Sequence, residues 1–294
     1  MIVAVATAGT PVRLRVMPLG ELLDETFKLY RRHFTVIAGV ALVIIVPNLI
    51  LSLVSGSYRA NPVTYLQNVV QNVNNPDELA RIQAQQRAYT GSPLYLLSFP
   101  IAALLLPFSV GALYRAATSL AAGNLETISS VLLGTLRRYF AVWGVVILAA
   151  LLFVGAIAIV TIPVVIWVAI RWSVAIPALF AEGVGPVKAL GRSWNLVRDN
   201  WWRTLGILII VAIMVSLIQT ALAALFGGVA AVVPGLSGDL RAGVVTTVTT
   251  LVDALVGAIT PIAITMLYLD LRVRKEGLDL DQLARQAAPG TAPA

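Results

Sequence analysis

Apolar residues along this chain follow two alternating patterns: short stretches in which they recur every three or four positions, and long stretches without any charge. Residues 186–201 show the first pattern and run directly into the second. One face of a helix over this stretch would carry Val187, Leu190, Trp194, Val197 and Trp201. The succession predicts an amphipathic helix that lies in a membrane surface and continues into a helix that enters the bilayer.

The same succession occurs three times. At an offset of 106 residues, Arg31 and Arg32 fall on Arg137 and Arg138, and at an offset of 167 Arg31 falls on Arg198. The amphipathic stretches cover residues 19–34, 124–138 and 186–201. A period this long indicates repeated architecture, with units at about residues 17–123, 124–183 and 184–277.

The ends of the three units also correspond. Each unit closes on a glycine, at Gly123, Gly183 and Gly277, and we expect each glycine to make the left-handed turn that ends a helix. The first and third units share a longer spacing, Pro107, Tyr114 and Gly123 in one and Pro261, Tyr268 and Gly277 in the other. The alternative is a chance similarity between apolar helices of low complexity.

The uncharged stretches are long enough to cross a membrane, which takes about 20 apolar residues for a helix. The chain has 294 residues, of which 59% are hydrophobic and 12% charged, whereas roughly a quarter are charged in a soluble domain. Six spans follow, at about residues 34–55, 94–114, 139–160, 163–181, 203–225 and 246–269. We therefore predict an all-α integral membrane protein whose six transmembrane helices form three helical hairpins, each preceded by a cytoplasmic amphipathic surface helix.

Around the single membrane domain at residues 17–287 we expect a flexible N-terminus at residues 1–16 and a disordered tail at residues 288–294. The longest outer connection, residues 56–92, is rich in Asn and Gln. Asn75 and Pro76 within it form a good helix start, so we expect two short helices there. A structural cover and a ligand-binding outer cap both fit this connection.

Charge indicates the orientation and the partner. Sixteen Lys and Arg residues fall in the connections on one side of the predicted spans and four on the other, which places both termini in the cytoplasm. The net charge is +7, but the basic residues are spread over four segments, each beside a span. Anionic lipid headgroups are therefore a nearer partner than nucleic acid. The candidate headgroup contacts are Arg31, Arg32, Arg137, Arg138, Arg198 and Arg203.

Arg171 is the one basic residue inside a predicted span, and an ionisable group there is a functional hypothesis by default. Helix arithmetic puts Asn48 at a similar depth and Asp253 about 18 Å away. One reading is structural: Arg171 bonds Asn48 and the carbonyl that Pro47 leaves without a partner. In the other, Arg171 faces a cavity and meets a lipid phosphate or another anion. A transporter or lipid-handling protein would line this cavity with Arg171, Asn48, Tyr114 and Tyr268.

The residues give catalysis little support. His33 is the single histidine, there are no cysteines, and the 14 acidic residues form no intramembrane pair. No HExxH, Walker or nucleophile-elbow pattern is present. We therefore predict no enzymatic activity, no catalytic residue, no metal and no cofactor.

Five short motifs lie at residues 17–24, 30–34, 171–178, 193–198 and 267–272. Together they resemble the glycerophosphoryl diester phosphodiesterase membrane-domain family of bacterial membrane proteins. The resemblance implies a multi-pass domain of a bacterial cytoplasmic membrane, sometimes attached to a soluble phosphodiesterase domain whose catalytic residues map onto no position here. The leading hypothesis is a non-enzymatic scaffold or accessory domain that engages anionic lipid. A protein partner or homo-oligomer and the transporter or lipid-handling role remain alternatives.

Overall fold

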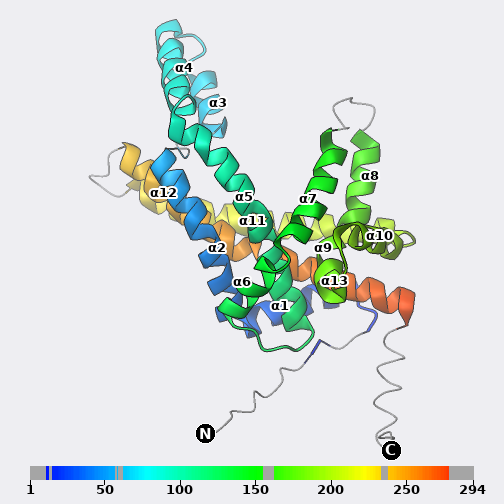
Figure 1. Cartoon of the computed structure of the whole chain (residues 1–294). Helices are drawn as coiled ribbons and strands as arrows, with labels where there is room; N and C mark the ends of the chain where they lie inside the picture. The colour runs from blue at the N-terminus through cyan, green and yellow to red at the C-terminus, as the bar shows by residue number, and fades with distance from the viewer. Residues whose placement is uncertain are drawn as a thin grey trace, which may run out of the picture. The chain divides into compact units, whose positions relative to one another are not determined.

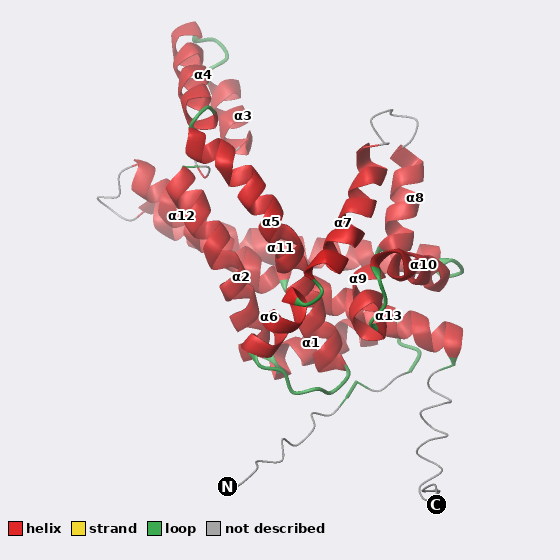
Figure 2. Ribbon diagram, viewed as in Figure 1, coloured by secondary structure: helices red, strands yellow, loops and turns green. Residues whose placement is uncertain are grey.

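The computed structural model describes residues 11–12, 15–56, 58, 62–154, 162–232 and 238–277, and these residues form helices and connections without a strand (Figure 1, Figure 2). The helices are α1 (Leu19–Arg32), α2 (Phe34–Ser55), α3 (Pro62–Gln71), α4 (Pro76–Thr90), α5 (Pro93–Ala121), α6 (Ile128–Leu136), α7 (Tyr139–Val154), α8 (Ile162–Trp172), α9 (Ala175–Glu182), α10 (Pro186–Val197), α11 (Trp201–Val232), α12 (Gly238–Gly257) and α13 (Ile259–Glu276). The all-helical class is confirmed for this part of the chain. Residues 1–10 and the predicted tail at 288–294 lie outside it.

Five helical stretches are long and apolar enough to cross a membrane. They are Phe34–Ser55, Pro93–Ala121, Pro163–Glu182, Trp201–Phe226 and Leu240–Glu276. A sixth arises if α6 and α7, which meet at a bend of 64°, form one span. The predicted third span, residues 139–160, is helical as far as Val154, and its last residues lie outside the description. The multi-span prediction is thus confirmed as five to six candidate helices, and the pairing into hairpins stays a prediction.

The chain forms two compact units. The first contains Met1–Val40, Val110–Leu217 and Gly257–Ala294, and the second contains Ala41–Ser109 and Ile218–Val256. The helices α2, α5 and α11 each contribute one end to either unit. All six arginines that the sequence nominates for lipid contact lie in the first unit.

Helix α13 lies at the centre of the first unit, where Met266, Leu267, Tyr268 and Leu271 are completely buried. It packs against α1, α9 and α10. Small residues bring neighbouring helices together: a Cβ added to Gly144 of α7 would lie 2.7 Å from the ring of Pro186 on α10. Close approach through glycine is common between membrane helices, which gain stability from tight packing.

In the second unit, α3 and α4 pack against each other. The predicted helix start is confirmed, because the Asn75 side chain accepts a hydrogen bond from the Glu78 amide at 3.2 Å and Pro76 takes the first helical position. This bond satisfies one of the amide groups that the first turn of a helix leaves open. The described side chains of α4 are not buried.

The left-handed turns are also confirmed. Gly123, Gly183 and Gly277 have φ angles of 82°, 69° and 62°, and each lies just after the end of a helix. A side chain at such a φ would be strained, so glycine suits these positions. The three unit boundaries therefore have the backbone conformation that the sequence predicts.

The face of α10 that packs inside the protein matches only part of the apolar face read from the sequence. Val187 is 72% exposed, whereas Ala189, Leu190, Ser193, Leu196 and Val197 are buried. Small Ala189 and Ser193 allow α10 to approach α7, α8 and α9 closely, and a pattern of large apolar residues does not reveal that face. The second amphipathic stretch also differs, since α6 begins at Ile128 after a Thr127 cap rather than at residue 124.

Candidate functional site

The predicted surface helices α1, α6 and α10 are each separated from the next helix by one to three residues, and we call these three places the corners. At each corner an exposed arginine precedes an exposed aromatic ring. The pairs are Arg31 with Phe34, Arg137 with Phe140, and Arg198 with Trp202. Phe140 is 85% exposed and Trp202 79% exposed. Arginine beside an exposed aromatic ring is typical of side chains at a membrane interface.

The first and third corners share their backbone geometry. The His33 carbonyl accepts from the Ile37 amide at 3.0 Å, and the Asn200 carbonyl accepts from the Thr204 amide at 2.9 Å. These residues are 167 positions apart, which is the offset read from the sequence. Burial, and to a lesser degree the Arg32 guanidinium, lower the pKa of His33 below its ordinary 6.5.

Two of the nominated arginines have acceptors inside the protein. Arg138 donates to the carbonyls of Leu179, Gly183 and Val184 at 3.3, 2.7 and 3.0 Å, around the C-terminus of α9. These carbonyls belong to a helix end, where the dipole favours a cation. Arg203 is bound to Asp270 at 3.0 Å. Both are therefore weaker candidates for headgroup contact than the corner arginines.

Asp270 organises an ion cluster that sequence reasoning missed. It is completely buried and accepts the Met17 amide at 2.7 Å, while Arg203 and Arg274 lie at 3.0 and 2.9 Å. Both arginines also donate to the Met17 carbonyl. The cluster ties the start of α1 to α11 and α13. An acidic residue between Leu269 and Leu271 is the sequence signal that could have revealed it.

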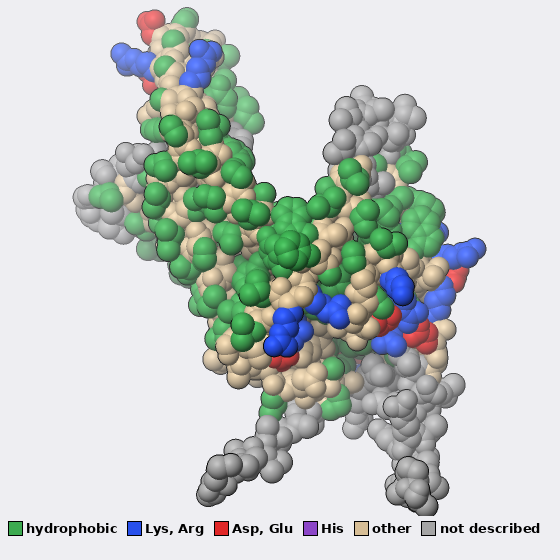
Figure 3. Space-filling view, viewed as in Figure 1, with side chains coloured by type: hydrophobic (Ala, Val, Ile, Leu, Met, Phe, Trp, Pro, Cys, Tyr) green, Lys and Arg blue, Asp and Glu red, His purple; other side chains and the backbone are tan. Residues whose placement is uncertain are grey.

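A second cluster surrounds Glu182 at the end of α9. Its carboxylate accepts the Tyr268 hydroxyl at 2.8 Å and the Arg192 Nε at 2.7 Å. Glu276 pairs with Arg192 and, at 3.0 Å, with Arg272. Figure 3 shows Lys, Arg, Asp and Glu side chains gathered near α10 and α13, while hydrophobic side chains lie over parts of α7 and α8. Within the first unit, charge is thus concentrated at one end of the candidate spans.

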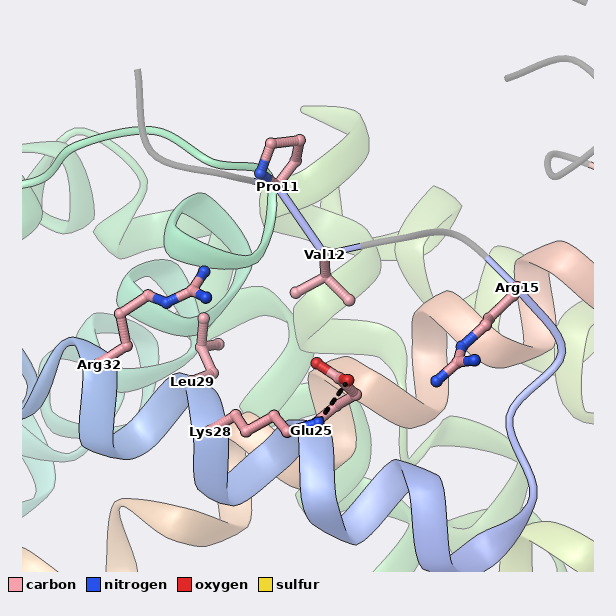
Figure 4. Close-up of a pocket in the computed structure, with 7 residues that line it drawn as sticks. All are labelled: Pro11, Val12, Arg15, Glu25, Lys28, Leu29 and Arg32. Carbon is pink, nitrogen blue, oxygen red and sulfur yellow. Dashed lines mark hydrogen bonds and ion pairs between the residues drawn. The ribbon is translucent and has the colours of Figure 1, made fainter. Parts of the chain in front are cut away.

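Cavities lie around these clusters. Tyr268 and Arg272 line one of about 280 Å³, together with Thr118 and Thr265. Another, of about 500 Å³, lies between Pro11, Val12 and Arg15 on one side and α1 on the other (Figure 4). Arg15, Lys28 and Arg32 extend around it, and Lys28 pairs with Glu25 at 3.3 Å. Such a cavity is suited to an anion more than to a cation, because its lining carries an excess of positive charge.

Arg171 of α8 lies between two tryptophans. Its guanidinium carbon is 4.2 Å from the ring centroid of Trp167 and 4.4 Å from that of Trp194 on α10. The two rings meet edge to face, with centroids 5.1 Å apart. The Trp201 indole donates to the Trp167 carbonyl at 3.2 Å. The cation is thus held against α10, within the candidate span Pro163–Glu182.

The candidate span Pro163–Glu182 contains a short break just after Arg171. Helix α8 ends at Trp172 and α9 begins at Ala175. The Ser193 hydroxyl of α10 accepts the Val174 amide at 3.2 Å and donates to the Arg171 carbonyl at 2.7 Å. One buried side chain therefore satisfies two backbone groups that the break would leave open, as an apolar environment requires.

The other nominated residues are not brought to Arg171 by any described bond. Asn48 lies in the second unit, where its amide nitrogen donates to the Ile44 carbonyl of the same helix at 3.3 Å. Tyr114 is half-buried in α5, and Tyr268 bonds Glu182. Asp253 is exposed in the second unit. The pairing of Arg171 with Asn48 stays a prediction.

The described residues contain no cluster of three or more His, Cys, Asp or Glu side chains that could hold a metal ion. Both acidic clusters hold arginine instead, with carboxylates and guanidinium groups in direct contact. The arrangement can bind anions and stabilise helix ends.

The chain is similar to one known family. The family described as the membrane domain of glycerophosphoryl diester phosphodiesterase matches residues 143–287, from α7 to beyond α13. The resemblance inferred from the sequence is confirmed over these residues, and the motifs at residues 17–34 lie outside them. No curated protein and no solved structure matches the chain.

Proposed function

Because residues 143–287 match the membrane domain of this phosphodiesterase family, we propose that the chain is a non-enzymatic membrane domain that engages anionic lipid headgroups through its corners. The observation that carries the proposal is the pairing of an exposed arginine with an exposed aromatic ring at all three corners. An aromatic ring inserted at the interface holds its neighbouring guanidinium at the level of the headgroups. The three sites would anchor the domain in the cytoplasmic leaflet of a bacterial membrane, with both termini in the cytoplasm.

The distribution of arginine partners supports this role. Arg138 and Arg203 are engaged by acceptors within the protein, whereas Arg137 and Arg198 are exposed. Each cation near an anionic surface contributes about 1 kcal/mol of attraction, which salt screens. Exposed corner arginines can contribute this attraction without disrupting the fold.

The experiment compares two double variants of equal charge change in lipid nanodiscs. Arg137→Gln with Arg198→Gln removes two corner cations, and Arg81→Gln with Arg87→Gln removes two exposed cations of α4. Thermal stability is measured in zwitterionic lipid, in anionic lipid, and in anionic lipid with added salt. We expect the wild type and the α4 variant to gain stability from anionic lipid, and the corner variant to lose about 2 kcal/mol of that gain. An equal gain in both variants would refute the role of the corners.

The non-enzymatic part has its own test. The purified chain is incubated with a glycerophosphodiester, with and without divalent cations, and the released alcohol is measured. We expect no release above the rate without protein, because a single histidine and paired carboxylates offer no assembled acid, base and metal site. Turnover that disappears on Glu182→Gln would show the proposal to be wrong.

The lipid-handling role remains a second candidate, supported by an apolar cavity of about 380 Å³. It lies in the first unit and is lined by Val146 of α7, Trp172 and Ile176. Its lining includes Ser173, whose buried hydroxyl has no partner among the described residues. A protein that moves lipid between leaflets would speed the exchange of a labelled lipid in vesicles. The anchoring role predicts an exchange rate equal to that of protein-free vesicles.

A further inference from the structure

We propose that Arg171, held between Trp167 and Trp194, binds the phosphodiester group of one anionic phospholipid. This site is separate from the corners, which attract many headgroups weakly. The inference rests on the proposed function in one respect, that the domain lies in a bilayer containing anionic lipid. Beyond the proposed function, it assigns one residue, Arg171, its guanidinium group and the phosphodiester that this group binds.

The Arg171 guanidinium contacts two aromatic rings, and its Nε has no described acceptor. Two indole rings approach it at 4.2 and 4.4 Å, and they attract the cation without accepting its N–H hydrogens in a normal bond. The Arg171 Nε is buried and has no hydrogen-bond partner in the described part of the chain. Described carboxylates form no ion pair with it either, and the nearby Asp199 pairs with Lys275 at 2.9 Å. Arg171 is therefore a cation held by two rings, and its Nε lacks an acceptor in this part of the chain.

Other arginines of the first unit do have acceptors within the protein. Five of them meet acceptors at normal hydrogen-bonding or ion-pair distance within the protein. They are Arg138, Arg192, Arg203, Arg272 and Arg274. Arg115 also has a buried Nε without a partner, but its terminal nitrogen lies 3.7 Å from Glu126, whereas Arg171 meets no described carboxylate. A buried charged donor is costly unless an acceptor reaches it. The acceptor must come from outside the described chain.

A phospholipid phosphate has the chemistry of the acceptor that Arg171 lacks. A planar guanidinium matches the two free oxygens of a phosphodiester and can bond both at once. Trp167 and Trp194 restrict its motion, so binding orders it little further. Trp201, which bonds the Trp167 carbonyl, is the first residue of the candidate span Trp201–Phe226. Tryptophans at the start of a span favour the level of the headgroups, where phospholipid phosphate is the most abundant anion.

The test uses the full chain, purified in a mild detergent and washed free of loosely bound lipid. Native mass spectrometry then follows the binding of short-chain phosphatidylglycerol, phosphatidylcholine or inorganic phosphate. For the wild type we expect one tightly held phosphatidylglycerol. We expect Arg171→Gln to bind it about tenfold more weakly or worse, and Arg171→Lys to fall between the two, because lysine keeps the charge but lacks the planar fork.

Two further variants keep the test decisive. Arg87→Gln, which removes an exposed cation of α4, should bind phosphatidylglycerol as the wild type does. Trp194→Leu keeps Arg171 but removes one wall, and we expect weaker binding even if Arg171→Gln does not fold. Wild-type affinity in Arg171→Gln, or in Trp194→Leu, overturns the site. Inorganic phosphate that displaces the lipid at equal concentration overturns the lipid as the source of the phosphate.

The two proposals fail in different measurements. The corner variant Arg137→Gln with Arg198→Gln changes the salt-dependent response to anionic lipid, and it leaves Arg171 unchanged. Loss of that response with the tight lipid retained therefore supports both assignments. A response that survives in the corner variant refutes the corners alone, while a lipid that survives Arg171→Gln refutes the Arg171 site alone.

Discussion

Replacing Ser193 with alanine should destabilise the first unit, because one hydroxyl bridges the break between α8 and α9. That hydroxyl accepts the Val174 amide at 3.2 Å and donates to the Arg171 carbonyl at 2.7 Å. Ser193 is completely buried, so water has little access to the groups that alanine would leave open. A buried polar group without a partner costs about 1–3 kcal/mol, and two such groups give roughly 2–6 kcal/mol.

The assay is thermal unfolding of the purified chain in one detergent, followed by loss of the monodisperse peak. A change of about 3 kcal/mol corresponds to a drop on the order of 10 °C for a domain of this size. The matched control is Ser109→Ala, because among the described residues the Ser109 hydroxyl donates to the Leu105 carbonyl of its own helix, at 2.9 Å. We expect the control to change stability by no more than about 0.5 kcal/mol.

An equal melting temperature for Ser193→Ala and Ser109→Ala would refute this reasoning, since it would mean that the break needs no partner from α10. Ser193→Cys refines the result. A thiol is a weak donor and a weak acceptor, so it should restore part of the stability. A cysteine variant that is less stable than the alanine variant would attribute the effect to side-chain volume.

Three further outcomes are expected. Gly144→Ala should lower the stability by about 1–3 kcal/mol, because the new Cβ would lie 2.7 Å from the rigid ring of Pro186. Gly206→Ala, whose Cβ would meet nothing within 4 Å, should be neutral or stabilising by up to about 1 kcal/mol, and equal melting temperatures for the two variants would contradict this expectation. Asp270→Asn should lower the stability by about 3–5 kcal/mol, because it leaves two arginines without their buried carboxylate. It should also expose the start of α1 to limited proteolysis, and unchanged proteolysis would contradict the role of Asp270 in holding that segment. NMR should give His33 a pKa below 6.5 in the folded protein. The stability that neutral His33 contributes above pH 6.5 should then be lost as the pH falls through this lowered pKa, whereas a folded pKa above 6.5 would make the stability rise as the pH falls.

The local backbone was predictable from the sequence where one residue determines it. Gly123, Gly183 and Gly277 were expected to turn left-handed and do so. The Asn75 cap with Pro76 was expected to start a helix and does. These features depend on the conformational range of single residues and on side chains within three positions. No distant contact is needed to form them.

The contacts of Arg171 were not predictable in the same way. Counting residues placed Arg171 inside a span, and the candidate span Pro163–Glu182 contains it, but the count could not report the turn at residues 173–174 or the packing against α10. The partner that makes the break tolerable is Ser193, about twenty positions later on a different helix. The Asp270 cluster was missed for the same reason, since Met17 and Arg203 meet that carboxylate from distant parts of the chain. Both features depend on tertiary contacts that periodicity does not report.

The charge count also needs interpretation once the contacts are known. The count of basic residues on each side of the spans gives every Lys and Arg the same weight. However, Arg138 donates to a carbonyl at the end of α9, and Lys275 donates to the Asn195 carbonyl in the last turn of α10. Cations at helix C-termini stabilise the dipole and the open carbonyls there. Such residues contribute to the fold whether or not a lipid is present, so neutralising them should lower stability equally in neutral and anionic lipid. The lipid-dependent part of the stability should therefore follow the exposed arginines, which form a smaller set than the sequence count suggests.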